Sequence, residues 1–183
     1  MKTVIGLVGE RLTGKDQAGE YLRQKHQAFY IRYSHILDEI LNVLNQPISR
    51  MNEINLGKAL RELYQKNVLW DGMQKRISES QADLVVIGSI RLQDEFESVK
   101  ALGAKMIYVT APLDLRYERS KQRTEKVGEA EQSMDEFTEI ERLWTEKEIP
   151  KLGAQCDFKI DNIGTEQELY KKLDDIIEKI LKS

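Results

Sequence analysis

Residues 9–16 read Gly9-Glu10-Arg11-Leu12-Thr13-Gly14-Lys15-Asp16, which has the spacing G-x-x-x-x-G-K of a phosphate-binding loop. The apolar run Val4-Ile5-Gly6-Leu7-Val8 precedes this stretch, and a segment with helical periodicity follows it. The two glycines allow backbone angles that a side chain would forbid, so the loop can turn its N–H groups toward an anion at a helix N-terminus. Lys15 would place a positive charge on the β- and γ-phosphates. The stretch therefore predicts nucleotide binding on a strand–loop–helix unit.

Asp16 occupies the position after the lysine, where loops of this kind usually have a Ser or Thr hydroxyl that holds Mg²⁺. A carboxylate there could hold the metal directly or through a water molecule, or it could repel the phosphates where no metal intervenes. We predict ATP and Mg²⁺ as cofactors, with Asp16 as the metal ligand. The residues of this region expected to hold ATP are Gly9, Arg11, Leu12, Thr13, Gly14, Lys15, Asp16 and Gln17.

Composition limits the classes of partner. The 183 residues include 28 Lys and Arg against 31 Asp and Glu, a net charge of −3. Because basic and acidic residues nearly balance, the composition gives no general argument for binding a nucleic-acid polymer. We expect no nucleic-acid polymer as a partner. The single cysteine, Cys156, rules out an internal disulfide framework. Because no run has the length and flanks of a signal peptide or a membrane span, we expect a cytoplasmic protein with no membrane partner.

Segments with strand and helix character alternate along the chain. Strands are expected at 4–8, 28–31, 83–87, 105–109 and 158–160, with helical periodicity between them. The run at 83–87 is continuous and apolar, which suits a strand buried on both faces. The alternation predicts a three-layer α/β/α fold with a five-stranded parallel sheet, formed by residues 1–183 as one domain. In such folds ligands sit beyond the carboxyl ends of the strands.

Local signals predict where helices begin and which sides they bury. Ser34 is expected to be the N-cap of a helix that ends before Pro47. Two capping boxes are expected to open later helices, Ser133 with Glu136 and Thr165 with Glu168. The helix expected over 50–64 should bury a side formed by Leu56, Leu60, Leu63 and Tyr64. Trp70 and Trp144 lie on apolar helical stripes and are expected in the core.

The helical segment at about 33–80 separates the second and third strands and is expected to bind the phosphate acceptor. Arg91 follows the buried strand at 83–87, where a guanidinium could grip the acceptor's phosphate with two hydrogen bonds. The alternative for Arg91 is a structural ion pair with Asp94 or Glu95. For His35, Arg50 and Arg61 the alternative is an exposed position on the surface. The candidate acceptor-binding residues are Ser34, His35, Arg50, Arg61 and Arg91.

A basic helical face begins a segment at about 113–148 that we expect to act as a lid. Arg116, Arg119 and Arg123 are spaced by three and four residues, which places them on one side of a helix. Folding over the phosphates, they would exclude water so that ATP is not hydrolysed. The alternative is a solvated basic surface. Arg116 is expected to contact ATP, and Arg119 and Arg123 are expected to be catalytic.

The chain resembles the P-loop nucleoside-monophosphate-kinase superfamily over nearly its whole length. It looks closest to deoxynucleoside monophosphate kinases and to dephospho-coenzyme-A-kinase-like proteins. The motifs are Gly9-x-x-x-x-Gly14-Lys15-Asp16, Tyr33-Ser34-His35-Ile36-Leu37, Leu56-Gly57-x-x-Leu60-Arg61-Glu62, Ile87-Gly88-Ser89-Ile90-Arg91, Ala111-Pro112-x-x-x-Arg116-Tyr117-x-Arg119 and Asn162-x-Gly164-Thr165. The resemblance implies that Arg91 contacts the acceptor's phosphate, that Arg119 and Arg123 belong to the lid, and that Asn162 and Gly164 lie near the adenine.

Three features of the sequence depart from the pattern that the resemblance implies. His35 stands where an aspartate often follows the serine, and Gly88-Ser89 stands where the strand often ends in aspartate-glycine. The lid segment is also unusually acidic. Without an aspartate at 35, a base for a sugar hydroxyl is missing, whereas an acceptor phosphate is already anionic and needs none. Without a carboxylate at 88, metal binding falls to Asp16.

These patterns predict an ATP-dependent phosphotransferase that moves the γ-phosphoryl of Mg-ATP to a nucleoside or deoxynucleoside monophosphate. Its catalytic residues would be Lys15, Arg91, Arg119 and Arg123. One alternative is a kinase for a non-nucleotide acceptor such as dephospho-coenzyme A or a phosphomevalonate-like compound. Another is a nucleotide-binding regulatory module without turnover. The sequence leaves open which small-molecule phosphate acceptor is used and whether the chain forms a homodimer.

Overall fold

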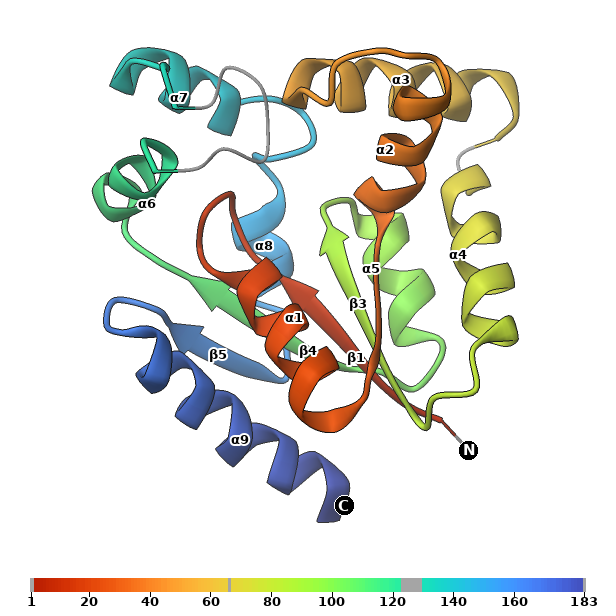
Figure 1. Ribbon diagram of the computed structural model, residues 1–183, viewed down its shortest axis with the longest axis vertical. Helices are drawn as coiled ribbons and strands as arrows, with labels where there is room; N and C mark the ends of the chain where they lie inside the picture. The colour runs from red at the N-terminus through yellow and green to blue at the C-terminus, as the bar shows by residue number, and fades with distance from the viewer. Residues whose placement is uncertain (1, 66, 123–129, 183) are drawn as a thin grey trace.

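The computed structural model describes residues 2–65, 67–122 and 130–182. Its strands are β1 (Thr3–Val8), β2 (Phe29–Arg32), β3 (Leu84–Ile90), β4 (Lys105–Thr110) and β5 (Phe158–Asp161). All pair in parallel, in the order β2-β3-β1-β4-β5. This confirms the α/β fold with a five-stranded parallel sheet. Because β1 is the central strand, the loop that follows it lies at the middle of the sheet's carboxyl edge (Figure 1).

Helices cover both faces of the sheet. The helices are α1 (Lys15–His26), α2 (Tyr33–Val43), α3 (Arg50–Leu63), α4 (Val68–Glu79), α5 (Gln93–Lys100), α6 (Leu113–Ser120), α7 (Met134–Glu141), α8 (Ile149–Gly153) and α9 (Glu166–Lys182). Figure 1 shows α1 and α9 on the near side of the sheet and α5 and α8 behind it. Among the described residues, no helix is long and apolar enough to cross a membrane.

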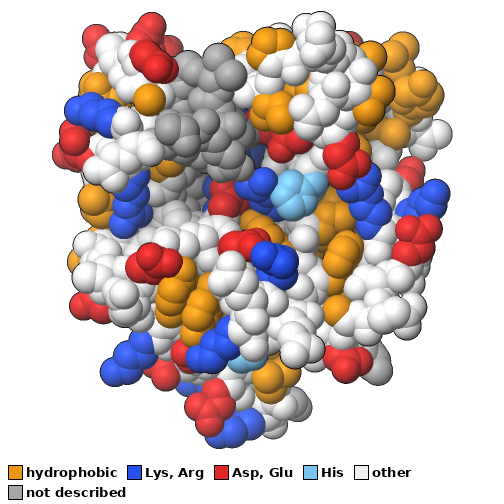
Figure 2. Space-filling view, viewed as in Figure 1, with side chains coloured by type: hydrophobic (Ala, Val, Ile, Leu, Met, Phe, Trp, Pro, Cys, Tyr) orange, Lys and Arg blue, Asp and Glu red, His pale blue; other side chains and the backbone are white. Residues whose placement is uncertain are grey.

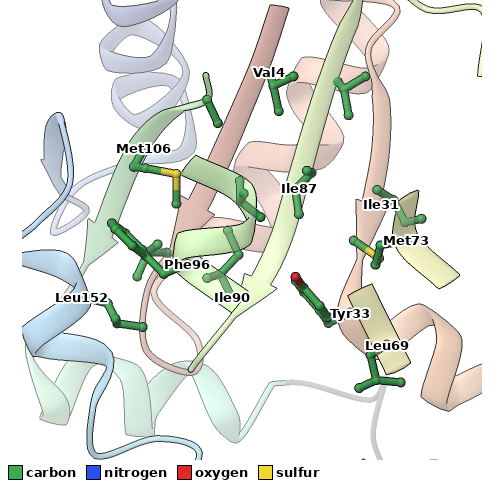
Figure 3. Packing of buried hydrophobic residues seen from close by; sticks show 14 of the residues in the cluster. Val4, Ile31, Tyr33, Leu69, Met73, Ile87, Ile90, Phe96, Met106 and Leu152 are labelled. Atoms are coloured by element: carbon green, nitrogen blue, oxygen red, sulfur yellow. The ribbon is translucent and has the colours of Figure 1, made fainter. Parts of the chain in front are cut away.

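The two hydrophobic layers follow from alternation along the buried strands. Ile5 and Leu7 pack with α1 and α9, whereas Val4 and Val8 face the opposite layer. Figure 3 shows that second layer, where Tyr33 from α2 and side chains from α4 approach β3. All seven residues of β3 are buried, as expected for a strand covered on both sides. The core thus fixes the direction of every strand end that carries a candidate site residue.

The prediction for the buried side of α3 is correct for Leu56 and Leu60, which pack against the hydrophobic core, and wrong for Leu63 and Tyr64. Leu63 and Tyr64 are 75% and 64% exposed, and apolar side chains show on the surface over α3 in Figure 2. The residues of the helix that are fully buried are Arg50, Glu53, Ile54 and Gly57. Its inward side therefore combines apolar packing through Ile54, Leu56 and Leu60 with a buried ion pair between Arg50 and Glu53. Hydrophobic periodicity alone cannot identify such a helix.

Two further local predictions are corrected, and two are confirmed. Ser34 is not an N-cap, because α2 begins one residue earlier with Arg32 at the cap. Trp144 is neither helical nor in the core: α7 ends at Glu141, and Trp144 is 38% exposed. Both capping boxes form, with Ser133 N–H donating to Glu136 and Thr165 N–H donating to Glu168. Caps depend on neighbours three residues apart, which is why the sequence predicts them well.

Gly9 is required by the neighbouring strand, and its replacement is the first testable prediction. A Cβ at position 9 would lie 2.2 Å from the carbonyl oxygen of Val109, a backbone atom of β4 that cannot turn away. We expect Gly9→Ala to lower the free energy of unfolding by about 1–3 kcal/mol, measured by urea denaturation. Gly72→Ala is the control, because a Cβ there meets only the end of Ile36 at 3.0 Å. Equal urea midpoints for Gly9→Ala and the unmodified chain would contradict this assignment.

Candidate functional site

The loop after β1 closes around the N-terminus of α1. Leu12 and Gly14 adopt positive φ angles of 61° and 91°, and α1 begins directly afterwards at Lys15. The Lys15 ammonium is buried and donates to the carbonyl oxygen of Glu10 at 3.1 Å. Loop backbone and lysine are therefore arranged around the end of a helix whose dipole favours an anion.

A cleft of about 360 Å³ opens beside this loop. It brings together many of the residues predicted to hold ATP, and its lining is Leu12, Gly14, Lys15, Asp16, Gln17, Arg119, Asn162, Gly164 and Glu166. Arg119 donates to the carbonyl oxygens of Leu12 at 3.2 Å and Asn162 at 2.9 Å. The Asn162 amide donates to the carbonyl oxygen of Thr13 at 2.8 Å. These bonds fasten α6 and the end of β5 to the loop, so the cleft has walls from three parts of the chain.

Arg116 and Arg11 lie elsewhere in the site. The Arg116 guanidinium donates to the backbone oxygens of Ala111 and Arg11 and pairs with Glu141 at 2.7 Å. Arg11 lies over the ring of Phe137, 4.9 Å from its centroid. Neither lines the nucleotide cleft. Their contacts with Phe137 and Glu141 join α7 to the loop. The third arginine of the predicted basic face, Arg123, lies outside the described residues.

Asp16 faces the cleft with its side chain 32% exposed. Its carboxylate accepts from the Tyr30 hydroxyl at 3.3 Å and lies 3.6 Å from the Arg32 guanidinium. At Gly88, where the sequence lacks the expected aspartate, a Cβ would already lie 3.0 Å from the Tyr30 hydroxyl. Tyr30 and Arg32 thus fill the space beside position 88. Asp16 and Glu166 are the two acidic residues in the lining of the cleft.

A second cavity lies between α2, α3 and the end of β3. Its volume is about 40 Å³, and its lining includes Ser34, Arg50, Arg61 and Arg91 from the predicted acceptor site. The lining also includes Trp144 and Thr145, which precede α8. Ser34 and Ser89 place their hydroxyl oxygens 3.3 Å apart at its floor. The structure therefore gathers four of the five candidate acceptor residues around one small space.

Each arginine of this cavity is ion-paired with a glutamate, and of these glutamates only Glu95 was expected from the sequence, as a partner of Arg91 instead of Arg61. Arg50 and Arg91 both pair with Glu146, Arg50 also pairs with Glu53 at 3.2 Å, and Arg61 pairs with Glu95. Burial by itself would raise the pKa of Glu146, but Arg91 and Arg50 hold that pKa below its usual range, and Lys15 adds to the effect. Nothing in the charged stretch around Glu146 distinguishes it from a surface residue, so only the fold identifies it.

His35 lies away from the other acceptor residues. It lines a separate groove with Phe29, Tyr30, Ile31, Arg76, Glu79 and Ser80. Its Nε2 accepts a hydrogen bond from Arg32 Nε at 2.7 Å. Because Arg32 in turn lies beside Asp16, His35 positions a cation next to the nucleotide cleft instead of contacting the acceptor cavity.

The titration of His35 is a second testable prediction. Burial, followed by the positive charge of Arg32, lowers the pKa of His35 below the ordinary value of 6.5, although Asp16 and Glu39 oppose the shift. Stability from the neutral imidazole is therefore fully present above pH 6.5 and is lost as pH falls through the lower folded-state pKa. We expect NMR titration of the imidazole to show this, and Arg32→Met to move the pKa partly back. A pKa above 6.5 would contradict the geometry.

A parallel five-stranded sheet with a phosphate-binding loop after its central strand defines a P-loop kinase fold. The chain belongs to the family described as "AAA domain", whose sequence model matches residues 5–143. TT1252 from Thermus thermophilus shares the fold with a TM-score of 0.66 at 17% identity over 97% of each chain. Shikimate kinase from Bacteroides thetaiotaomicron shares it with a TM-score of 0.65 at 15% identity over 99% of each chain.

Curated relatives match the chain over nearly its whole length. A UPF0200/UPF0201 protein of Archaeoglobus fulgidus is 30% identical over 189 residues, which cover 98% of this chain and 56% of that protein. The chain thus spans little more than half the length of that relative. A UPF0200 protein of Saccharolobus islandicus is 26% identical over 98% of this chain and 95% of its own length. The names of these relatives state no activity.

Proposed function

We propose that the protein is an ATP-dependent phosphotransferase that moves the γ-phosphoryl of Mg-ATP to the phosphate of a nucleoside or deoxynucleoside monophosphate. The observation that carries the proposal is the proximity of its two sites. The loop that carries Lys15 follows β1, and Arg91 follows β3, and these two strands pair in parallel with Val8 opposite Ile90. A nucleotide phosphate held by Lys15 would therefore lie at the same edge of the sheet as the arginine-lined cavity.

The chemistry follows from this arrangement. Phosphoryl transfer depends on aligned reactants and on positive charge around the migrating group, with little covalent help from the protein. Lys15 and the loop N–H groups would hold the donor phosphates, and Arg119 would cover the cleft from α6. Arg50 and Arg91 would hold the acceptor's phosphate. Mg²⁺ supplies further charge neutralisation when bound with ATP, and Asp16 is the residue that would contact it.

A second candidate is transfer to a non-nucleotide acceptor. The arginines of the cavity are matched by Glu53, Glu95 and Glu146, so the cavity is less positive than its arginines alone suggest. The shikimate kinases that share the fold take a non-nucleotide acceptor, as their name states. Shikimate, dephospho-coenzyme A and phosphomevalonate therefore belong in the same assay as the nucleotides.

The test is coupled ADP release from Mg-ATP against ribo- and deoxyribonucleoside monophosphates and the three non-nucleotide compounds. We expect ADP formation with one class of nucleoside monophosphate. Binding of ATP is measured separately by calorimetry. ADP formation only with a non-nucleotide compound would replace the proposed acceptor, and tight ATP binding without turnover on any acceptor would favour a nucleotide-binding regulatory module.

A further inference from the structure

Glu146 joins two arginines that come from distant parts of the chain. Its Oε1 accepts from Arg50, the first residue of α3, and its Oε2 accepts from Arg91, which follows β3. The Thr145 hydroxyl lies 3.1 Å from Oε1 and 3.3 Å from an Arg50 nitrogen. Glu146 is 3% exposed and Arg50 is 7% exposed. Two guanidinium groups and a hydroxyl thus converge on one carboxylate inside the protein, which is the donor set of an oxyanion site.

The carboxylate satisfies this site incompletely. Arg50 Nε is buried and has no hydrogen-bond partner among the described residues. A carboxylate has two oxygens with about four acceptor positions, but here these oxygens accept from other arginine nitrogens and do not reach Arg50 Nε. A phosphate offers a third oxygen for a remaining donor. Buried unsatisfied donors cost free energy, so the site favours an anion with more oxygens than Glu146 provides.

The segment that carries Glu146 also narrows the cavity. Trp144 and Thr145 form part of the cavity wall, and with this segment in place the cavity volume is only about 40 Å³. That is far below the roughly 300 Å³ at which small-molecule sites begin. The segment between α7 and α8 is built of turns, in which the N–H groups of Glu146 and Lys147 both donate to the carbonyl oxygen of Leu143. Side-chain contacts of Thr145 and Glu146 join it to Arg50 and Arg91. The segment itself belongs to no helix or strand.

We propose that Glu146 is an internal ligand that occupies the acceptor-phosphate site, and that the phosphate of the acceptor displaces it when the acceptor binds. This inference rests on the proposed function, and it narrows the substrate class. The acceptor is a phosphomonoester, whose phosphate competes with Glu146 for Arg50 and Arg91. A neutral nucleoside has no group that could do so and is excluded. Displacement of Glu146 also removes a negative charge from the path between the acceptor and Lys15.

The test measures binding of inorganic phosphate without turnover. Trp70→Phe leaves Trp144 as the only tryptophan, because the chain has two. We expect phosphate to shift the emission of Trp144 as its segment moves. Glu146→Gln in this background keeps the size of the side chain and one accepting oxygen, and we expect it to bind phosphate at least tenfold more tightly. Glu146→Asp should retain the charge and give an intermediate affinity if Glu146→Gln fails to fold.

Two control variants test whether Glu146→Gln acts by vacating the phosphate site or only by removing a negative charge from this region. Glu53→Gln removes a negative charge from the same Arg50 but leaves Glu146 in place, and we expect less than a threefold change in phosphate affinity. Glu148→Gln alters the same segment at a side chain that pairs with Lys151 at 3.0 Å, and we expect no change. Equal tightening by Glu53→Gln and Glu146→Gln would overturn the inference, as would unchanged phosphate affinity in Glu146→Gln.

Kinetics distinguish the inference from the proposed function. If the chain transfers phosphate, Glu146→Gln should lower the KM for the acceptor. A loss of kcat at unchanged KM would make Glu146 a catalytic group and overturn the inference while the proposed function stands. If no acceptor is phosphorylated but Glu146→Gln still binds phosphate tightly, the oxyanion site is supported and the proposed function fails.

Discussion

Lys15→Met is expected to lower the rate of phosphoryl transfer by about 10²–10³-fold, or more, while leaving the fold intact. The Lys15 ammonium is the loop's mobile charge, and its loss removes stabilisation of the charge that develops on the transferred phosphate. Methionine fills a similar volume at this buried position, so no large cavity forms. Asp16 keeps Arg32 as a neighbour at 3.6 Å after the change. The measurement is kcat/KM in the ADP-release assay, together with thermal unfolding.

Lys25→Met is the matched control for Lys15→Met. Lys25 lies on the same helix, with its side chain 48% exposed and paired with Asp174 at 2.8 Å. We expect its activity to equal that of the unmodified chain. Lys15→Met that folds and retains full transfer would remove Lys15, and with it the loop, from the proposed mechanism.

Arg91→Met is expected to lower the free energy of unfolding by about 3–5 kcal/mol and to abolish use of the acceptor. Removing the Arg91 guanidinium leaves the buried Glu146 carboxylate with Arg50 as its remaining ion-pair partner. A buried charge that loses a partner pays a desolvation cost that its remaining contacts do not offset. Urea denaturation gives the stability change, and the ADP-release assay gives the loss of transfer.

The double variant Arg91→Met with Glu146→Gln separates stability from function. Neutralising both partners removes the uncompensated charge, so we expect it to recover much of the stability lost in Arg91→Met. Phosphoryl transfer should stay absent, because the acceptor's phosphate still lacks the Arg91 guanidinium. Additive losses of stability in the two single variants would show that Arg91 and Glu146 do not form an energetic pair.

The fold and the nucleotide side of the site are largely readable from the sequence. The loop at Gly9 to Lys15, the strand before it and the helix after it are consecutive in the chain, and their pattern depends on neighbours a few residues apart. The capping boxes at Ser133 and Thr165 are local in the same sense. Such features can be predicted without knowledge of the tertiary structure, because the interactions that create them act over about one helical turn.

The acceptor side is less readable because its partners are distant in sequence. Arg50 and Arg91 are separated from Glu146 by 96 and 55 residues. The sequence offers several acidic residues for each arginine, and Asp94 and Glu95 were the obvious candidates for Arg91. Its side chain instead reaches Glu146, while its backbone N–H donates to Glu95 at 2.9 Å. Only the packed position of each element selects among partners of equal charge.

The sequence by itself determined the parallel α/β architecture, the phosphate-binding loop and the gathering of candidate residues at the carboxyl edge of the sheet. Only the tertiary structure decided that α3 turns Arg50 and Glu53 inward, that His35 faces another groove, and that Glu146 pairs with both Arg50 and Arg91. The reason is physical. Periodicity and glycine spacing specify local backbone, whereas the burial of a charge is decided by which distant group can neutralise it.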